Sequence, residues 1–378
     1  MACSILASQL ILGRSPVEVV VKKLTSHATL GDVAREARVG KSTVSRVING
    51  GARVSPETIE RINAVIRKFD YQPNHAARIL KGNRTKTIGL IIPYVADPFF
   101  AICAEAAQEI ARANDFLLIV TCSNNDPRVE MENLNRLLQR RIDGLLLAPA
   151  ASQNEELVTV LNRNSVPVVS FDRPILGASW PSVVSNNYKG AKEGTRHLIS
   201  HGYKRIVFLG MKGEHSLYTN KERIRGYRSA MREASLAPRI DVSLTSYESV
   251  ELALKAYLYS ANPPDAIFAV KNLVTVYCFE ALHKLRVKIP NRVALLGFDD
   301  FELASALDPA ITVVKQEMEV MGKMAAELLF EQLATKRRGQ SKASRISEAA
   351  GIRWLDTQLV LRDSCGCDLG GRRGTSSK

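Results

Sequence analysis

Charged and amide side chains follow several apolar segments of this chain, at the points where those segments end. They are Asp172-Arg173 after Val166–Phe171, Lys271-Asn272 after Ala266–Val270, and Asp299-Asp300 after Val293–Leu296. Arg223 opens a predicted helix soon after another such segment. Carboxylates, amides and a guanidinium that meet at one edge suit a hydroxyl-rich ligand, because each hydroxyl both donates and accepts a hydrogen bond. Any one of these residues could equally cap a helix or turn, but their recurrence at equivalent ends indicates a ligand site.

A second group of polar residues lies near the N-terminus and suits nucleic acid. A helix predicted from Lys41 turns Val44, Val47 and Ile48 to one face and leaves the following residues outward: Lys41, Ser42, Ser45 and Arg46. Short hydroxyls suit phosphate oxygens, while lysine and arginine reach base edges in the major groove. Residues 27–85 hold eleven Lys/Arg against five Asp/Glu. The alternative is a small helical subdomain with a solvated basic face.

The elements around this helix predict a helix-turn-helix. Thr29 to Asp32 fits a capping box, and the apolar face that follows is Val33, Ala34 and Ala37. A third helix is predicted from Ser55-Pro56, which supplies a serine cap and a proline at the first helical position. The predicted apolar stripe of this third helix is Ile59, Ile62, Ile66 and Phe69. Three short helices around one core, with a tight turn before the second, are typical of DNA-reading domains.

After residue 85 short apolar runs alternate with amphipathic segments. Strands are predicted at Thr87–Ile92, Phe116–Thr121, Gly144–Leu147, Val166–Phe171, Ile206–Leu209, Ala266–Val270, Val293–Leu296 and Ile311–Val314. Helices are predicted near 100–113, 129–140, 155–163, 189–201, 222–234, 250–258, 273–285 and 318–334. Strands that are apolar throughout and alternate with helices indicate parallel sheets covered on both faces. Eight such strands fit one barrel or two doubly wound lobes.

Other reactive residue types form no recognisable catalytic pattern. Cys365-Gly366-Cys367 is a candidate metal pair, but no second pair or histidine cluster accompanies it in the sequence. His197, His201 and His283 stand as isolated residues on predicted helices. The sequence shows no glycine-rich phosphate loop and no Gly-x-Ser-x-Gly turn. We therefore expect no catalytic residues, no metal, no cofactor and no enzyme activity.

Length, charge and cysteine usage set broader limits. A chain of 378 residues is expected to form two or three domains, and a net charge of +14 favours a polyanionic partner such as nucleic acid. Six scattered cysteines fit a reducing cytoplasm better than a secreted disulfide framework. No apolar run suggests a membrane span. No basic residue precedes the apolar run Ser4–Leu12, so residues 1–27 are expected to be a disordered tail or a misassigned start rather than a signal peptide.

Taken together, the motifs resemble the lactose-repressor (LacI/GalR) family over residues 28–364. The headpiece motifs are Thr29-Leu30-Gly31-Asp32-Val33-Ala34, Thr43 to Gly50, Val54-Ser55-Pro56-Glu57-Thr58 and Tyr71-Gln72-Pro73-Asn74. Further motifs are Thr87 to Pro93, Asp97-Pro98-Phe99-Phe100, Arg141 to Gly144, Phe171 to Pro174, Gly297 to Asp300 and Leu359 to Arg362.

The resemblance implies an N-terminal all-α helix-turn-helix headpiece and an α/β core similar to periplasmic binding proteins, with two doubly wound lobes crossed by three strands. The implied boundaries are 28–73 for the DNA-binding domain, 74–85 for the hinge helix and linker, 86–364 for the effector-binding and dimerisation core, and 365–378 for a disordered tail. It further implies a bacterial homodimer, cytoplasmic and associated with the nucleoid, which binds a near-palindromic DNA operator and usually represses transcription.

Individual residues take roles by position in the family pattern. Lys41, Ser42 and Arg46 match base-reading positions, and Thr29 and Ser45 match phosphate contacts. The predicted DNA-binding set is completed by Thr43, Asn74 and Leu80, the last of which would wedge into the minor groove from the hinge helix. The predicted effector set is Phe100, Asp172, Thr219, Arg223, Lys271, Asn272 and Asp299.

Departures from the family pattern refine the expectation. Arg38 stands where the family usually has glycine, and Gly40 stands where it usually has serine. Lys271-Asn272 replaces the common Asn-Asp pair, which removes an acid and adds a base beside Arg223. A buried lysine requires an anionic partner, so we expect an anionic effector: a sugar acid such as gluconate or keto-gluconate, or a sugar phosphate. The alternative is a lysine that reaches out of the cleft beside a neutral sugar.

A free-standing sugar-binding protein is the rival from another class. It would have a secretion signal and no headpiece, so the Lys41–Asn49 segment and the missing basic n-region oppose it. We therefore expect a repressor of carbohydrate or sugar-acid utilisation genes whose operator affinity changes when the effector alters the lobes.

Overall fold

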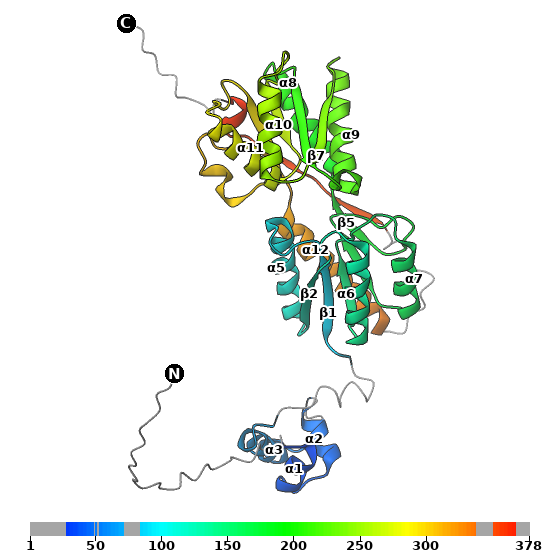
Figure 1. The fold of residues 1–378 in the computed structure, drawn as a ribbon. Coiled ribbons are helices and arrows are strands. Elements are labelled where there is room, and N and C mark those ends of the chain that lie inside the picture. Colours follow the sequence, from blue (N-terminus) through cyan, green and yellow to red (C-terminus); the bar gives the residue numbers. More distant parts are fainter. Residues whose placement is uncertain (1–27, 49, 51–52, 72–83, 338–350, 368–378) are drawn as a thin grey trace, which may run out of the picture. The chain divides into compact units, whose positions relative to one another are not determined.

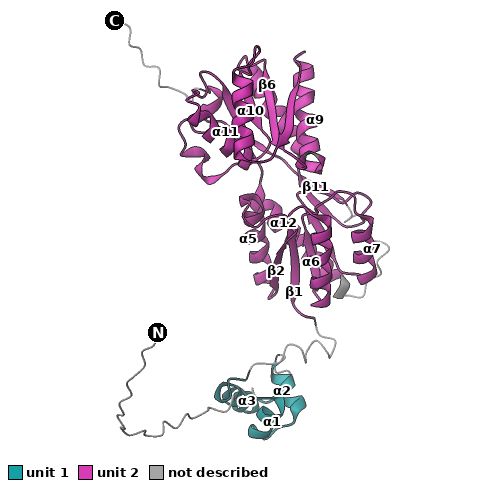
Figure 2. Ribbon diagram, viewed as in Figure 1, with its two compact units in different colours: residues 1–83 teal, residues 84–378 magenta. Residues whose placement is uncertain are grey.

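The computed structural model describes residues 28–48, 50, 53–71, 84–337 and 351–367. The chain divides into two compact units, residues 1–83 and residues 84–378 (Figure 2). The first unit is built around one apolar core, whereas the described residues of the second unit form three. The predicted hinge segment, including Asn74 and Leu80, lies outside the described residues, as does the segment 1–27.

The first unit contains the three predicted helices α1 (Leu30–Glu36), α2 (Lys41–Ile48) and α3 (Pro56–Lys68). Thr29 and Asp32 form the predicted capping box, and Ser55 caps α3 with Pro56 in the first turn. Val33, Val44 and Ile62 are fully buried where the helices meet. The capping residues and the apolar spacing thus produce the predicted three-helix core.

Arg38 occupies the turn between α1 and α2 with φ +54°. This left-handed conformation places Cβ of a non-glycine residue close to the following carbonyl oxygen, at a cost of roughly 1–2 kcal/mol. The turn therefore does require the positive φ for which glycine is better suited.

The second unit contains two α/β lobes, whose sheets are parallel except at the antiparallel edge strand β12 (Gln358–Val360) of lobe two (Figure 1). In lobe one the strands lie in the order β2-β1-β3-β4-β5-β11. Their bounds are Leu117–Cys122, Thr87–Ile92, Gly144–Leu147, Val168–Phe171, Ser182–Ser185 and Ile352–Leu355. Helices α5 (Pro98–Ala113) and α12 (Met318–Arg337) cover one face of this sheet, while α6 (Pro127–Gln139) and α7 (Glu155–Asn164) cover the other. Neighbouring residues of β1 enter the two cores alternately, which explains why its apolar run is unbroken.

Lobe two repeats this order with β7-β6-β8-β9-β10-β12. The strand bounds are Arg239–Leu244, Ile206–Met211, Ala266–Ala269, Ala294–Phe298, Thr312–Lys315 and Gln358–Val360. The helices are α8 (Asn187–Ser200), α9 (Tyr218–Glu233), α10 (Tyr247–Leu258) and α11 (Asn272–Lys284), with short 3₁₀ turns at Glu214–Ser216, Glu302–Ser305 and Asp363–Cys365. Two separate sheets exclude the single-barrel alternative and confirm the doubly wound lobes.

The chain passes between the lobes three times, as the family resemblance implies. The first passage joins β5 to α8, the second joins β10 to α12, and the third joins β11 to β12. No helix in the described ranges is both long and apolar enough to cross a membrane.

Candidate effector pocket and DNA-binding surface

A pocket lies between the two lobes, beyond the carboxyl ends of their strands. It is partly open to solvent. Its lining consists of Tyr94, Asp97, Phe99, Phe100, Asn125, Asp172, Arg173, Glu214, Leu217, Thr219, Asn220, Arg223, Lys271, Asp299 and Gln316. In doubly wound sheets this edge is the usual place for a ligand.

Six of the seven predicted effector residues line this pocket: Phe100, Asp172, Thr219, Arg223, Lys271 and Asp299. Asn272 is not part of the lining, but its amide nitrogen donates to the lining residue Asp97 across 3.4 Å. Arg223 does not open its helix as expected, because α9 begins at Tyr218. It reaches the pocket from the second turn of α9.

Asp172 and Arg173 form one wall as a buried ion pair. The Nε atom of Arg173 donates to Asp172 across 2.9 Å. The same guanidinium donates to the side-chain oxygen of Asn125 across 2.8 Å and to the carbonyl of Pro149 across 2.9 Å. Three acceptors thus fix the arginine, and Asp172 is held in place beside it.

Arg223 forms the opposite wall and is held as firmly. Its Nε donates to Asn187 and its Nη1 to the carbonyl of Val270, each across 2.7 Å. The guanidinium lies 3.8 Å from the ring centroid of Phe298 and 3.5 Å from a carboxylate oxygen of Asp299. Burial against an aromatic face and beside a carboxylate suits a planar guanidinium.

Two of the three aspartates that line the pocket, Asp172 and Asp299, resist ionisation because they are buried. Burial raises the pKa of Asp172, and the charges of Arg173 and Arg223 oppose that rise. Burial also raises the pKa of Asp299, with Arg223 and the amide of Gln316 acting in the opposite direction. Ligand hydroxyls that donate to these carboxylates would favour their charged form.

Lys271 already has an acidic partner in the protein, so it does not need an anionic effector to balance its charge. Its Nζ lies 2.7 Å from Oε1 of Glu214, and both side chains are mostly buried. The anionic partner that a buried lysine requires is therefore supplied within the protein, by Glu214. Glu214 was missed because it lies on a short 3₁₀ turn three residues beyond the end of β6 rather than directly after the strand.

Gln316 is a further pocket residue that the sequence reading missed. It directly follows β10, so the rule that identified Asp172 and Asp299 could have found it. Its Nε2 donates to Asp299, while its Oε1 is buried and has no hydrogen-bond partner among the described residues. An unsatisfied buried carbonyl beside a cavity requires a donor, which a ligand hydroxyl can supply.

The outward face of α2 carries the predicted base-reading side chains. Lys41, Ser42 and Arg46 are exposed, and Thr43 and Ser45 are half-buried. The hydroxyl of Thr29 donates to Asp32 across 2.6 Å as part of the helix cap. The exposed cations and hydroxyl on one short helix fit insertion into a DNA groove.

The C-terminal cysteines are neither isolated nor in a free tail. Cys365 is fully buried, and both Cys365 and Cys367 lie within hydrogen-bond distance of His197. Cys367 also contacts His201. The expectation of isolated histidines was wrong for His197 and His201, because these contacts join residues far apart in the sequence. Cys365 ends a 3₁₀ turn rather than opening a tail.

Two family models match the two units of the chain. Residues 29–74 match "Bacterial regulatory proteins, lacI family". Residues 85–355 match "Periplasmic binding proteins and sugar binding domain of LacI family".

Named relatives share about a third of their residues with this chain. Catabolite control protein A of Staphylococcus epidermidis is 31% identical over 302 residues, which cover 80% of this chain and 91% of the relative. The ribose operon repressor of Haemophilus influenzae is 30% identical over 309 residues, which cover 81% and 92%.

Solved structures share the fold. A lac repressor dimer bound to operator and the anti-inducer ONPF superimposes with a TM-score of 0.78 at 22% identity, covering 90% of this chain and 99% of that one. A complex of the transcriptional regulator CelR with cellobiose gives 0.63 at 27% identity, covering 89% and 99%. From the family models and the extent of these matches, the chain belongs to the LacI family of bacterial regulatory proteins.

Proposed function

We propose that this protein is a sequence-specific transcriptional repressor of carbohydrate-utilisation genes, acting at its operator in the bacterial cytoplasm and nucleoid. The observation that carries the proposal is one chain with an exposed basic recognition helix and a buried hydrogen-bonding pocket. The names of the relatives, which include a ribose operon repressor and a catabolite control protein, support regulation of sugar metabolism.

Homodimerisation is part of this proposal. The lac repressor, which shares the fold, is a dimer on its operator. One recognition helix reads only a few base pairs, so two copies are needed for a site of useful specificity, and two-fold symmetry requires a near-palindromic operator. Effector binding would change DNA affinity by favouring one arrangement of the two lobes.

The paired charges of the pocket favour a neutral, hydroxyl-rich sugar as the effector. Arg173, Arg223 and Lys271 each contact a carboxylate, so an anionic ligand would have to displace one of those partners. The unsatisfied Oε1 of Gln316 calls for a donor, which a sugar hydroxyl supplies.

An anionic sugar, such as gluconate, a keto-gluconate or a sugar phosphate, is the second candidate. Lys271 lines the pocket and is joined to Glu214 by one contact, so it could exchange that partner for a ligand anion. Glu214→Gln separates the two candidates, because it releases Lys271 for an anion while keeping a side chain of the same size.

A thermal-shift panel on the purified full-length protein tests the effector class. A ligand at about 100 times its Kd stabilises the folded protein by about 2.7 kcal/mol, which is readily detected. We expect a neutral sugar to raise the melting temperature and Gln316→Leu to abolish that shift. Lys212→Ala, which changes an exposed lysine beyond β6, is the matched control and should leave it unchanged.

The opposite pattern would identify the second candidate. A shift with sugar acids alone, enhanced in Glu214→Gln and lost in Lys271→Met, would contradict the neutral-sugar assignment. A panel without any stabilising sugar or sugar acid would contradict the sensor role of the pocket.

A further inference from the structure

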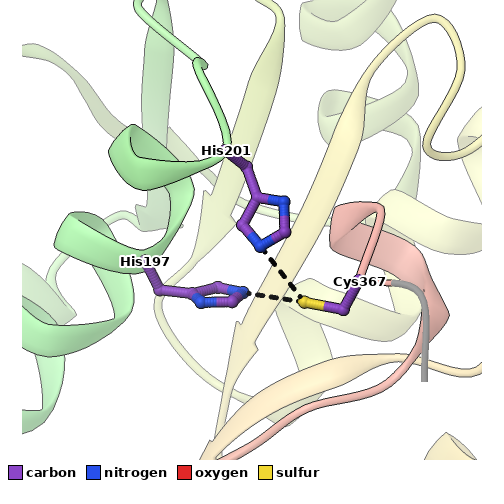
Figure 3. A group of neighbouring side chains, drawn as sticks. All are labelled: His197, His201 and Cys367. Atoms are coloured by element: carbon purple, nitrogen blue, oxygen red, sulfur yellow. Dashed lines mark hydrogen bonds between the residues drawn. The ribbon is translucent and has the colours of Figure 1, made fainter. Parts of the chain in front are cut away.

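Four side chains that ligate soft metals meet at the carboxyl end of α8 in lobe two. Cys367 Sγ lies 3.3 Å from Nε2 of His197 and 3.3 Å from Nε2 of His201 (Figure 3). Cys365 Sγ lies 3.2 Å from Nε2 of His197 and 3.1 Å from Cys367 Sγ. The ligand atoms of His197, His201 and Cys367 all lie within 4.8 Å of one another.

Helix geometry brings the two histidines together. His197 and His201 are four residues apart, which places both on the same side of α8. His201 is the C-cap of this helix, and the two rings are 4.7 Å apart and edge to face. Both imidazoles turn toward the sulfur of Cys367 (Figure 3). A cation at this place also meets the negative end of the α8 dipole, which favours it.

A tight turn at the C-terminal segment directs the two thiols to the same place. Gly366 between them has φ +79°, a left-handed conformation that glycine adopts without steric cost. Ser364 fixes the turn, because its hydroxyl donates to the Leu295 carbonyl across 2.6 Å and accepts from the Thr312 amide across 2.8 Å. The cysteines are thus positioned by the strands β9 and β10 beneath them.

The observed separations are close to those of a tetrahedral zinc site. Zinc bonds of about 2.3 Å to sulfur and about 2.0–2.1 Å to nitrogen give ligand–ligand edges of roughly 3.3–3.8 Å. The three Sγ–Nε2 separations of 3.2–3.3 Å need to widen by only a few tenths of an ångström, and the Sγ–Sγ separation of 3.1 Å needs to widen by roughly 0.7 Å. Both cysteines are free thiols, so their sulfur atoms are available as ligands.

We propose that His197, His201, Cys365 and Cys367 bind one Zn²⁺ ion. Two imidazoles and two thiols form a Cys₂His₂ donor set, which suits zinc better than hard cations that prefer oxygen. Thr312 Oγ1 lies 3.0 Å from Cys365 Sγ and can donate to the thiolate as an outer partner. The ion fastens the C-terminal segment to α8, the helix whose first residue, Asn187, holds Arg223 in the pocket.

Cobalt(II) titration of the full-length, tag-free and reduced protein tests this site directly. We expect one Co²⁺ per chain, with the ligand-field bands of a tetrahedral ion and a thiolate-to-cobalt charge-transfer band, both lost on addition of Zn²⁺. Cys367→Ser and His201→Asn should each lower the affinity by about 100-fold or more, since loss of even an outer partner costs 10–100-fold. Zinc content of the protein as purified provides a second readout.

Matched controls separate the site from general metal binding. Cys122→Ser changes a half-buried cysteine of β2, and His283→Asn changes an exposed histidine of α11; both variants should bind cobalt as the parent does. Zinc should raise the melting temperature of the parent and of both controls but not of Cys367→Ser. Equal binding by all variants, no stoichiometric binding by the reduced parent, or a Cys365–Cys367 disulfide that persists under reducing conditions would overturn the proposal.

Discussion

Buried charged side chains in the second unit differ in how well hydrogen bonds and neighbouring charges within the protein stabilise their charged form. Arg173 has three acceptors around its guanidinium, two of them neutral oxygens. Glu130 on α6 is less well compensated: it is fully buried and accepts from the amide of Ala150 across 2.6 Å. Burial raises the pKa of Glu130 to about 7, while that amide and the charge of Arg173 oppose the rise.

This raised pKa predicts a pH-dependent stability that Glu130→Gln removes. Between the ordinary value of 4.5 and about 7, folded Glu130 holds a proton that the unfolded chain releases. The contribution is fully present below pH 4.5 and is lost as the pH rises through 7, by about 3 kcal/mol in total. Urea unfolding at pH 5 and pH 8 should show the variant gaining stability relative to the parent as the pH rises. Glu132→Gln, an exposed position on the same helix, serves as control, and equal behaviour of the two variants would contradict the assignment.

At the scale of elements, close helix contacts depend on residues without a side chain. Helices α8 and α9 pack together through Gly226, where an added Cβ would lie 2.2 Å from the carbonyl oxygen of Tyr188. These helices also carry Asn187 and Arg223, which are hydrogen-bonded to each other. The packing of this pair therefore positions one wall of the pocket.

Gly226→Ala should destabilise the core by at least about 1–3 kcal/mol, because the backbone of α8 has to move away. Gly351→Ala is the matched control, since nothing lies within 4 Å of its added Cβ. Chemical unfolding of the two variants beside the parent provides the measurement. A loss of stability that is the same in both would show that glycine flexibility, rather than the close approach, is responsible.

Strands whose residues form a continuous apolar run could be predicted from the sequence, and strands without a clear apolar pattern could not. All eight predicted strands are present, because continuous apolar runs such as β3 are buried on both faces. Four strands were missed: β5, β7, β11 and β12. The edge strand β7 is mostly half-buried, and the crossing strand β11 is mostly exposed, so neither shows a clear apolar pattern.

The residues of the candidate sites also divide into those that could be predicted from the sequence and those that could not. Residues that directly follow strands, such as Asp172 and Asp299, could be identified because parallel strands end at one edge. The partner of Lys271 could not, because Glu214 is 57 residues away on an irregular turn. The contact between His197 and Cys367 spans 170 residues and depends on how the C-terminal segment folds back on α8.

At the scale of the whole molecule, the proposed function requires that the DNA-binding surface and the effector pocket of one chain act together as a switch. Each unit has its own core, so the headpiece and the lobes can fold as separate bodies. Coupling between them requires that the effector bind two lobe arrangements with different affinities, and a typical coupling changes affinity by about 5–150-fold.

The most direct measurement is selection of duplex DNA from the source genome by the full-length protein, followed by titration of the selected duplex with and without the stabilising sugar. We predict enrichment of a near-palindromic sequence and a change in Kd of at least about fivefold on addition of the sugar. Arg46→Ala should weaken binding by about 10–100-fold, the cost of one lost base contact. The control Arg163→Ala, which changes an exposed arginine on α7, should bind like the parent. No enriched sequence, or equal affinity of the two arginine variants, would contradict the account.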